Sequence, residues 1–219
     1  MCRHSRYSGC RSHRPGYDVQ HAEGPDRFHR YGCPDPCHGS FSEPLRLPQR
    51  AECIHRGSLR NFHALPEAWR DGSRLAARQE MLHASYLAGF AFTNNFVGYV
   101  HAIAHAVGAL YHIPHGRANA VLLPAVLREY GSCIAPKLAV LADALSLGGD
   151  TVSEKAERMI AAIEAMRDSF DIPSTLPHIS PNDYTEIARR ALKEANPTYP
   201  VPQIWDSEKI FSVLRRVQS

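Results

Sequence analysis

The sequence lacks several patterns that would each indicate a class of protein. No apolar run is long enough to cross a bilayer, and the basic first residues contain no apolar stretch of the kind that directs secretion. Neither G-x-G-x-x-G nor Gly-Gly-Gly-Ser occurs, so no loop that cradles a dinucleotide pyrophosphate is predicted. With 219 residues and a formal net charge of +3, the chain is expected to form one or two compact cytoplasmic domains without a membrane partner.

Strand-type alternation is also missing, and helical spacing of apolar residues takes its place after residue 64. The expected helices cover residues 73–92, 97–110, 118–130, 135–145, 151–169, 182–195 and 206–217. Thr151 and Glu154 have capping-box spacing at the start of one helix, and Asp206 is a typical N-cap for another. We therefore expect an all-α fold, a helical bundle, over residues 65–219.

Residues 1–64 have a different composition from the rest of the chain. They contain five of the six cysteines, seven of the thirteen histidines and ten arginines, but no lysine and one valine. So few apolar residues predict a largely irregular segment. Cys33, Cys37 and His38 suggest zinc, but no clean second ligand pair follows. Acidic residues and prolines dilute the arginines, so no nucleic-acid partner is expected.

Three histidines carry the strongest functional pattern. His101 and His105 are four residues apart in an apolar, alanine-rich run, so a helix would place both rings on one face. Pro114 should end this helix and Gly116 should allow a tight turn, so His115 is expected to return toward that face from a loop. Imidazoles that meet in this way suit a divalent metal and a proton relay. Core histidines bonded to backbone or water would have the same spacing, so that alternative stays open.

Residues 88–124 form the string AGFAFTNNFVGYVHAIAHAVGALYHIPHGRANAVLLP. It resembles the signature of the iron-containing (group III) alcohol dehydrogenases, N-x-x-x-G-x-x-H-x-x-x-H followed by P-H-G-x-x-N-A-x-x-L-P. The resemblance implies that His101 and His115 are metal ligands, and that His105 is the family's histidine near the nicotinamide and the substrate. It continues more loosely to the C-terminus, and so implies the helical C-terminal domain of the dehydroquinate synthase-like fold over about residues 65–219.

The resemblance also implies a reaction, the NAD(P)-linked oxidation of a small alcohol or reduction of an aldehyde. A divalent ion, Fe²⁺ or Zn²⁺, held by one carboxylate and three imidazoles would act as a Lewis acid on the alcohol. The family's dinucleotide-binding domain and two of its four ligands are not recognisable in this sequence. We therefore expect a fragment that is inactive as written, with association into a homo-oligomer left open. The alternative is a non-enzymatic helical module, or a pseudogene fragment, with structural histidines.

A shifted reading frame would explain the composition of residues 1–64. When the coding sequence implied by residues 21–41 is read one base later, its degenerate codons permit a string that resembles the family's metal-binding signature. An aspartate codon then straddles Gly32 and Cys33, and a histidine codon four positions later straddles Pro36 and Cys37. The sequence therefore predicts that residues 1 to about 64 are out of frame and that the family's N-terminal part is truncated. The alternative is that so biased a segment can be shifted into many strings.

Overall fold

The computed structural model describes residues 48–219, without the side chains of residues 48–51 and 93–95. The helices are α3 (Pro48–Arg70), α4 (Leu75–Asn95), α5 (Tyr99–Tyr111), α6 (His115–Tyr130), η2 (Gly131–Cys133), α7 (Ala135–Ala144), α8 (Val152–Ser169), η3 (Pro181–Asp183), α9 (Tyr184–Ala195) and α10 (Ser207–Val217). Between residues 48 and 219 no strand forms, although an isolated bridge joins Leu176 to Gln218. The expected all-α class is confirmed.

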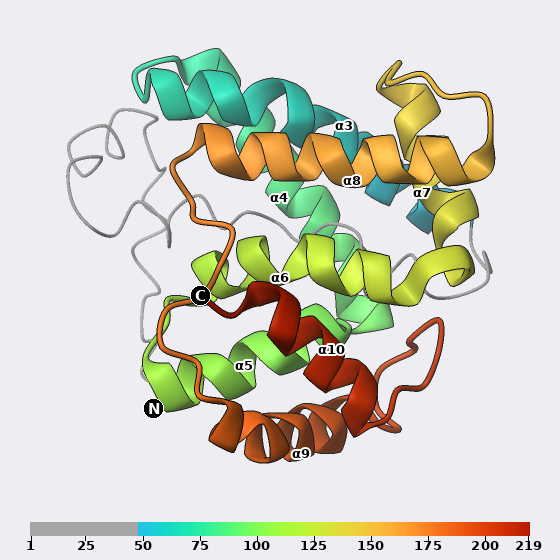
Figure 1. The fold of residues 1–219 in the computed structure, drawn as a ribbon. Helices are drawn as coiled ribbons and strands as arrows, with labels where there is room; N and C mark the ends of the chain where they lie inside the picture. The colour runs from blue at the N-terminus through green and yellow to red at the C-terminus, as the bar shows by residue number, and fades with distance from the viewer. Residues whose placement is uncertain (1–47) are drawn as a thin grey trace, which may run out of the picture.

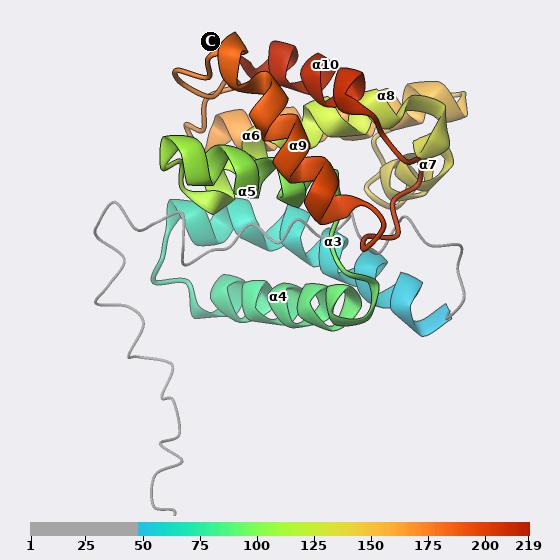
Figure 2. The same cartoon turned by 90° about the horizontal axis from the view of Figure 1, so that it is seen from below.

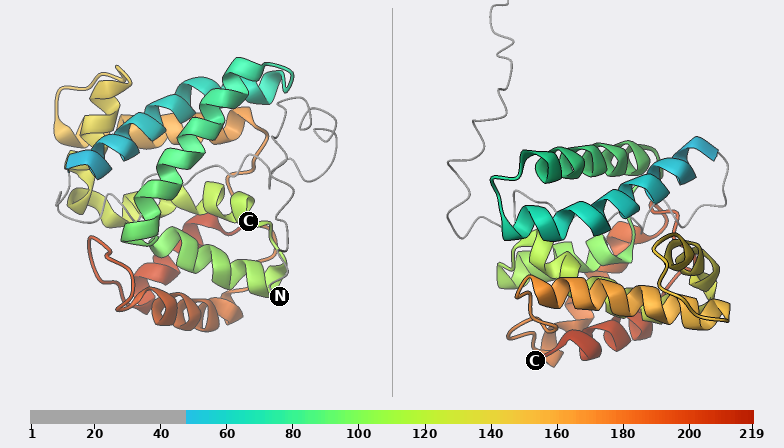
Figure 3. Two further views of the ribbon diagram at one scale, coloured as in Figure 1. Left: turned by 180° about the vertical axis from the view of Figure 1, so that it is seen from behind. Right: turned by 90° about the horizontal axis from the view of Figure 1, so that it is seen from above.

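The helices are arranged in layers (Figure 1). Helices α3 and α4 pack against each other as one layer, and α5 and α6 lie between this layer and α9 and α10 (Figure 2). Helix α8 packs against both α6 and α7. Figure 3 shows α3 and α4 together on the outside of the molecule in both views. The order places α5, which carries two of the candidate histidines, in the middle of the fold.

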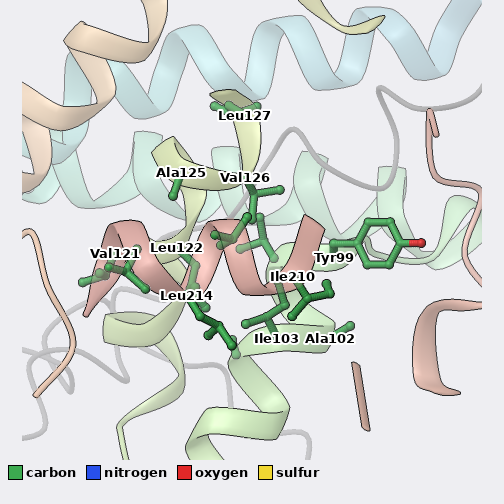
Figure 4. Packing of buried hydrophobic residues seen from close by; sticks show 14 of the residues in the cluster. Tyr99, Ala102, Ile103, Val121, Leu122, Ala125, Val126, Leu127, Ile210 and Leu214 are labelled. Atoms are coloured by element: carbon green, nitrogen blue, oxygen red, sulfur yellow. The ribbon is translucent and has the colours of Figure 1, made fainter. Parts of the chain in front are cut away.

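The main core lies where α5, α6 and α10 meet (Figure 4). It is built from alanine and branched aliphatic side chains that recur at helical spacing, among them Ala102, Ile103, Leu122, Ile210 and Leu214. Each of these five is fully buried. Burial of a leucine or isoleucine side chain contributes roughly 1.5–3 kcal/mol. The faces of α5 and α6 that these residues occupy are therefore fixed, and the remaining faces are free to carry polar groups.

The structure corrects the expected extent of the irregular segment. Residues 48–64 were expected to be irregular, but they form most of α3, which packs along α4. Ile54, Ala64 and Leu65 of this helix are buried. The few apolar residues of the stretch recur at helical spacing, and this pattern outweighs its low apolar content. Cys33, Cys37 and His38 lie outside the described residues.

The predicted helix starts at Thr151 and Asp206 are confirmed. The Thr151 hydroxyl accepts from the Glu154 backbone N–H at 3.2 Å, and the Glu154 carboxylate accepts in return from the backbone N–H of Thr151. The Asp206 carboxylate accepts from the Lys209 backbone N–H at 3.1 Å. Each cap satisfies donors that the first helical turn leaves without an internal partner.

Helix α4 presents apolar side chains to solvent. Leu75, Leu82, Tyr86 and Phe90 follow one another at intervals of seven and four residues, and each is exposed. Intervals of this kind put all four on one face of a helix. Among the helices of residues 48–219, none combines the length and the hydropathy needed to cross a membrane.

Candidate functional site

The three candidate histidines gather at one place, where the first two turns of α5 face the first turn of α6. The ring centroids of His101 and His115 are 5.2 Å apart, and those of His105 and His115 are 5.0 Å apart with the rings stacked. His101 and His105, one turn apart on α5, are separated by 6.1 Å. The prediction that these three imidazoles share one site agrees with this geometry.

The chain brings His115 to this site in a different way from the one expected. His115 is the first residue of α6 and does not lie in a loop, and Pro114 occupies the N-cap position. The reversal takes place at His112, which ends α5 in the left-handed conformation (φ 54°, ψ 33°) and donates its backbone N–H to the Gly108 carbonyl. This arrangement is a common helix C-cap, usually made by glycine or asparagine. Gly116 therefore lies inside the helix and does not make the turn.

Burial separates the three rings chemically. His101 is half-buried beside the core, whereas His105 and His115 are exposed. Burial is the main cause that lowers the pKa of His101 to about 4, and the nearby His115 and His105 rings lower it further. A neutral imidazole is the form that binds metals. His101 is therefore in its ligating form across the neutral pH range.

Polar neighbours hold the other two rings. The side-chain amide nitrogen of Asn119, one turn along α6, lies 3.0 Å from Nε2 of His115. Nδ1 of His105 lies 2.8 Å from the Glu194 carboxylate on α9. The same carboxylate oxygen accepts a hydrogen bond from the Tyr199 hydroxyl at 2.6 Å. The sequence pattern had pointed to none of these three partners.

Asn119 could have been found from the sequence, because it lies four residues after His115 and so on the same helical face. Glu194 and Tyr199 could not, since 89 residues separate Glu194 from His105. Only the packing of α9 against α5 brings them together.

The donor set fits a divalent metal in part. Ligand nitrogens lie ~2.0–2.1 Å from a zinc ion, so rings whose centroids are 5.2 Å apart are near enough to share one ion. A stable site needs three or four ligands. Within residues 48–219, no group of three or more His, Cys, Asp or Glu side chains is arranged to hold a metal ion. His101 and His115 thus offer two donors of a larger set.

Comparisons with known proteins agree with the family resemblance of the sequence. Residues 61–218 match the model of the "Fe-containing alcohol dehydrogenase family, C-terminal". Alcohol dehydrogenase 4 of Saccharomyces cerevisiae is 35% identical over 183 residues, which cover 82% of this chain and 47% of the yeast protein. The 1,3-propanediol dehydrogenase of Klebsiella pneumoniae is 39% identical over 149 residues, covering 66% of this chain and 38% of that protein.

A solved structure of a 1,3-propanediol oxidoreductase superposes with a TM-score of 0.78 at 32% identity, covering 85% of this chain and 49% of that one. The chain spans about half the length, or less, of these relatives. Because the family model covers most of the chain, including the whole histidine site, the chain belongs to the Fe-containing alcohol dehydrogenase family and carries its C-terminal helical domain.

Proposed function

We propose that this chain is a fragment of a metal-dependent alcohol dehydrogenase, and that in the intact enzyme it forms the metal and substrate side of a site that acts on a small alcohol or aldehyde. In the oxidation direction the alcohol carbon gives a hydride to the nicotinamide ring of NAD(P), and the hydroxyl gives its proton to His105. The observation that carries this proposal is the gathering of three imidazoles from α5 and α6, with neighbouring ring centroids 5.0 and 5.2 Å apart. Membership of the family supports the reaction class.

In this proposal His101 and His115 hold a divalent ion, Fe²⁺ or Zn²⁺, both of which imidazole suits. When bound, such an ion supplies Lewis acidity that makes an alcohol hydroxyl easier to deprotonate. The low pKa of His101 supports this role, because the ring then loses no proton when it ligates. His105, one turn along α5 and more exposed, is placed to accept the hydroxyl proton.

We further propose that the chain as written binds metal weakly and has little or no dehydrogenase activity. It contains two of the family's four ligand positions, and affinity for a divalent ion falls steeply when the ligand number falls. The missing aspartate and histidine are those that the shifted reading of residues 21–41 would restore.

An out-of-frame segment over residues 1 to about 64 therefore remains our proposal for the N-terminal part. The buried side chains of α3 favour a return to the ancestral frame ahead of residue 64. Nucleotide sequencing across codons 15–70 tests it. Codons that cannot encode the shifted string would refute the proposal.

Metal binding by the purified chain tests the ligand roles. Titration with Co²⁺ or Zn²⁺, followed by calorimetry and by the visible spectrum of Co²⁺, should report weak binding. His101→Ala and His115→Ala should each weaken it by at least about tenfold, the loss expected when a group that supports a metal site is removed. His105→Ala should leave it nearly unchanged, as should the control His83→Ala on the exposed surface of α4.

Equal binding by His101→Ala and the unchanged chain, or no binding at all, would favour the non-enzymatic helical module with structural histidines.

Self-association is a separate proposal. The exposed apolar face of α4, formed by Leu75, Leu82, Tyr86 and Phe90, is the surface that a second copy or a further domain would cover. Sedimentation measurements at several concentrations would test it.

A further inference from the structure

We propose that Glu194 is a positioning residue for His105, holding its ring in the Nδ1–H tautomer so that Nε2 is the nitrogen that takes the substrate proton. This inference rests on the proposed function and deepens it. The sequence pattern does not contain it, because Glu194 lies on α9 and His105 on α5.

The contacts of one carboxylate oxygen carry the argument. Oε1 of Glu194 lies 2.8 Å from Nδ1 of His105 and 2.6 Å from the hydroxyl oxygen of Tyr199. An ionised carboxylate only accepts hydrogen bonds. The Tyr199 hydroxyl therefore donates its proton to Oε1, and the hydrogen on the His105 ring must be on Nδ1 for the second bond to form.

Tyr199 is a dependable donor in this arrangement. Burial raises the pKa of Tyr199 well above its ordinary value, and the hydrogen bond to Glu194 and the charge of that carboxylate raise it further. The hydroxyl thus keeps its proton at neutral pH. Its ring also stacks on Phe96, with centroids 6.3 Å apart.

The segment that carries these groups is anchored independently of His105. The Tyr99 hydroxyl at the start of α5 donates to the Asn196 side-chain oxygen at 2.8 Å and accepts from the Trp205 backbone N–H at 2.8 Å. Asn196 lies two residues after Glu194, and Trp205 closes the following loop. The segment that follows Glu194 is therefore fixed to the start of α5, and this anchoring limits how far the carboxylate can move relative to the His105 ring.

Glu194 also differs from Glu186, the other acidic residue of α9. Glu186 is half-buried, as Glu194 is, but it pairs with Arg189 and Arg190 on its own helix, both at 2.7 Å. Glu194 makes its bonds to a tyrosine and to a histidine of another helix. A carboxylate that serves only as a surface charge would resemble Glu186.

The tautomer decides which nitrogen of the His105 ring accepts the substrate proton. With the hydrogen on Nδ1, the lone pair is on Nε2, which faces away from Glu194 across the ring. In the oxidation the alcohol O–H bond would break and its proton would join Nε2, while the C–H electron pair would leave as hydride, which the nicotinamide of the intact enzyme would accept. The imidazolium that results keeps its Nδ1–H on the carboxylate, which stabilises the charge.

Nitrogen NMR of the metal-free chain tests the proposal, because ¹⁵N shifts of labelled histidine distinguish a protonated ring nitrogen from an unprotonated one. At pH 8 we expect His105, assigned with the His105→Gln variant, to carry its hydrogen on Nδ1. Glu194→Leu should move a substantial share of it to Nε2. Glu194→Gln should retain the Nδ1–H form, because the amide oxygen still accepts, and the control Glu186→Leu should change nothing at His105.

An Nε2–H form in the unchanged chain, or a Glu194→Leu spectrum identical to it at His105, would overturn the proposal. If Glu194→Leu does not fold, the Glu194→Gln spectrum and the unchanged chain still decide the tautomer. None of these readings needs metal or turnover. A failure of metal binding by His101 and His115 would thus refute the proposed function while leaving the tautomer result standing.

Discussion

Removal of the Tyr99 hydroxyl should destabilise the whole helical domain. The side chain is fully buried, and its ring stacks on Trp205 at 4.5 Å with the planes within 7°. Tyr99→Phe keeps this stacking but removes the acceptor of the Trp205 backbone N–H and the donor to Asn196. The experiment therefore isolates the two hydrogen bonds from the apolar packing.

The cost comes mainly from the Trp205 side of the pair. Trp205 is buried, so its backbone N–H would lose its partner without gaining water, and an unsatisfied buried donor costs about 1–3 kcal/mol. Asn196 is half-buried, and its side-chain oxygen can turn to solvent. We therefore expect the free energy of unfolding to fall by about 2 kcal/mol.

Urea unfolding followed by far-UV circular dichroism measures this loss. With a slope of about 2 kcal/mol per molar, the midpoint should fall by about 1 M. Tyr86→Phe is the matched control, because Tyr86 is 71% exposed. It should change the free energy of unfolding by less than about 0.5 kcal/mol. A Tyr99→Phe midpoint equal to that of the unchanged chain would refute the role given to this hydroxyl.

Two further predictions concern the caps and ion pairs of α8. Thr151→Ala removes the acceptor of the Glu154 backbone N–H and should cost about 1 kcal/mol in the same assay. Arg128 makes two hydrogen bonds to Glu164, at 2.5 and 2.8 Å, and these bonds are the main cause that lowers the pKa of the Glu164 carboxyl. A carboxyl whose folded-state pKa is lowered stabilises the fold above its unfolded pKa and loses that effect as pH falls through the folded value. Glu164→Gln should therefore lower the free energy of unfolding by less than about 1 kcal/mol at pH 7, because the pair is partly exposed. Below pH 4.5 the free energy of unfolding of the variant should fall less steeply with pH than that of the unchanged chain. Equal pH dependence of the two proteins in this range would contradict the prediction.

The fold could be read from the sequence where local rules decide it. Helical spacing of apolar residues located seven of the helices to within a few residues, and the capping pattern at Thr151 gave the start of α8 correctly. The prediction from composition was wrong for residues 48–64, which were expected to be irregular and form most of α3. Few apolar residues are enough for a helix when all of them lie on the face that packs.

The candidate site divides in the same way. The four-residue interval between His101 and His105 by itself put both rings on one side of α5. The string around them indicated the family, because it resembles the family's signature. Tertiary structure alone decided how His115 reaches them, because a left-handed residue at His112, a conformation uncommon for residues other than glycine, turns the chain.

It also decided which carboxylate meets His105. The interval between Glu194 and His105 has no periodicity to detect, and their contact depends on how α9 packs on α5. Sequence therefore determined the chemistry available at the site, through residue types at helical spacing. The packing of helices distant in the sequence determined which groups orient that chemistry, because hydrogen bonds of this kind form only after the core has fixed the relative positions of the helices.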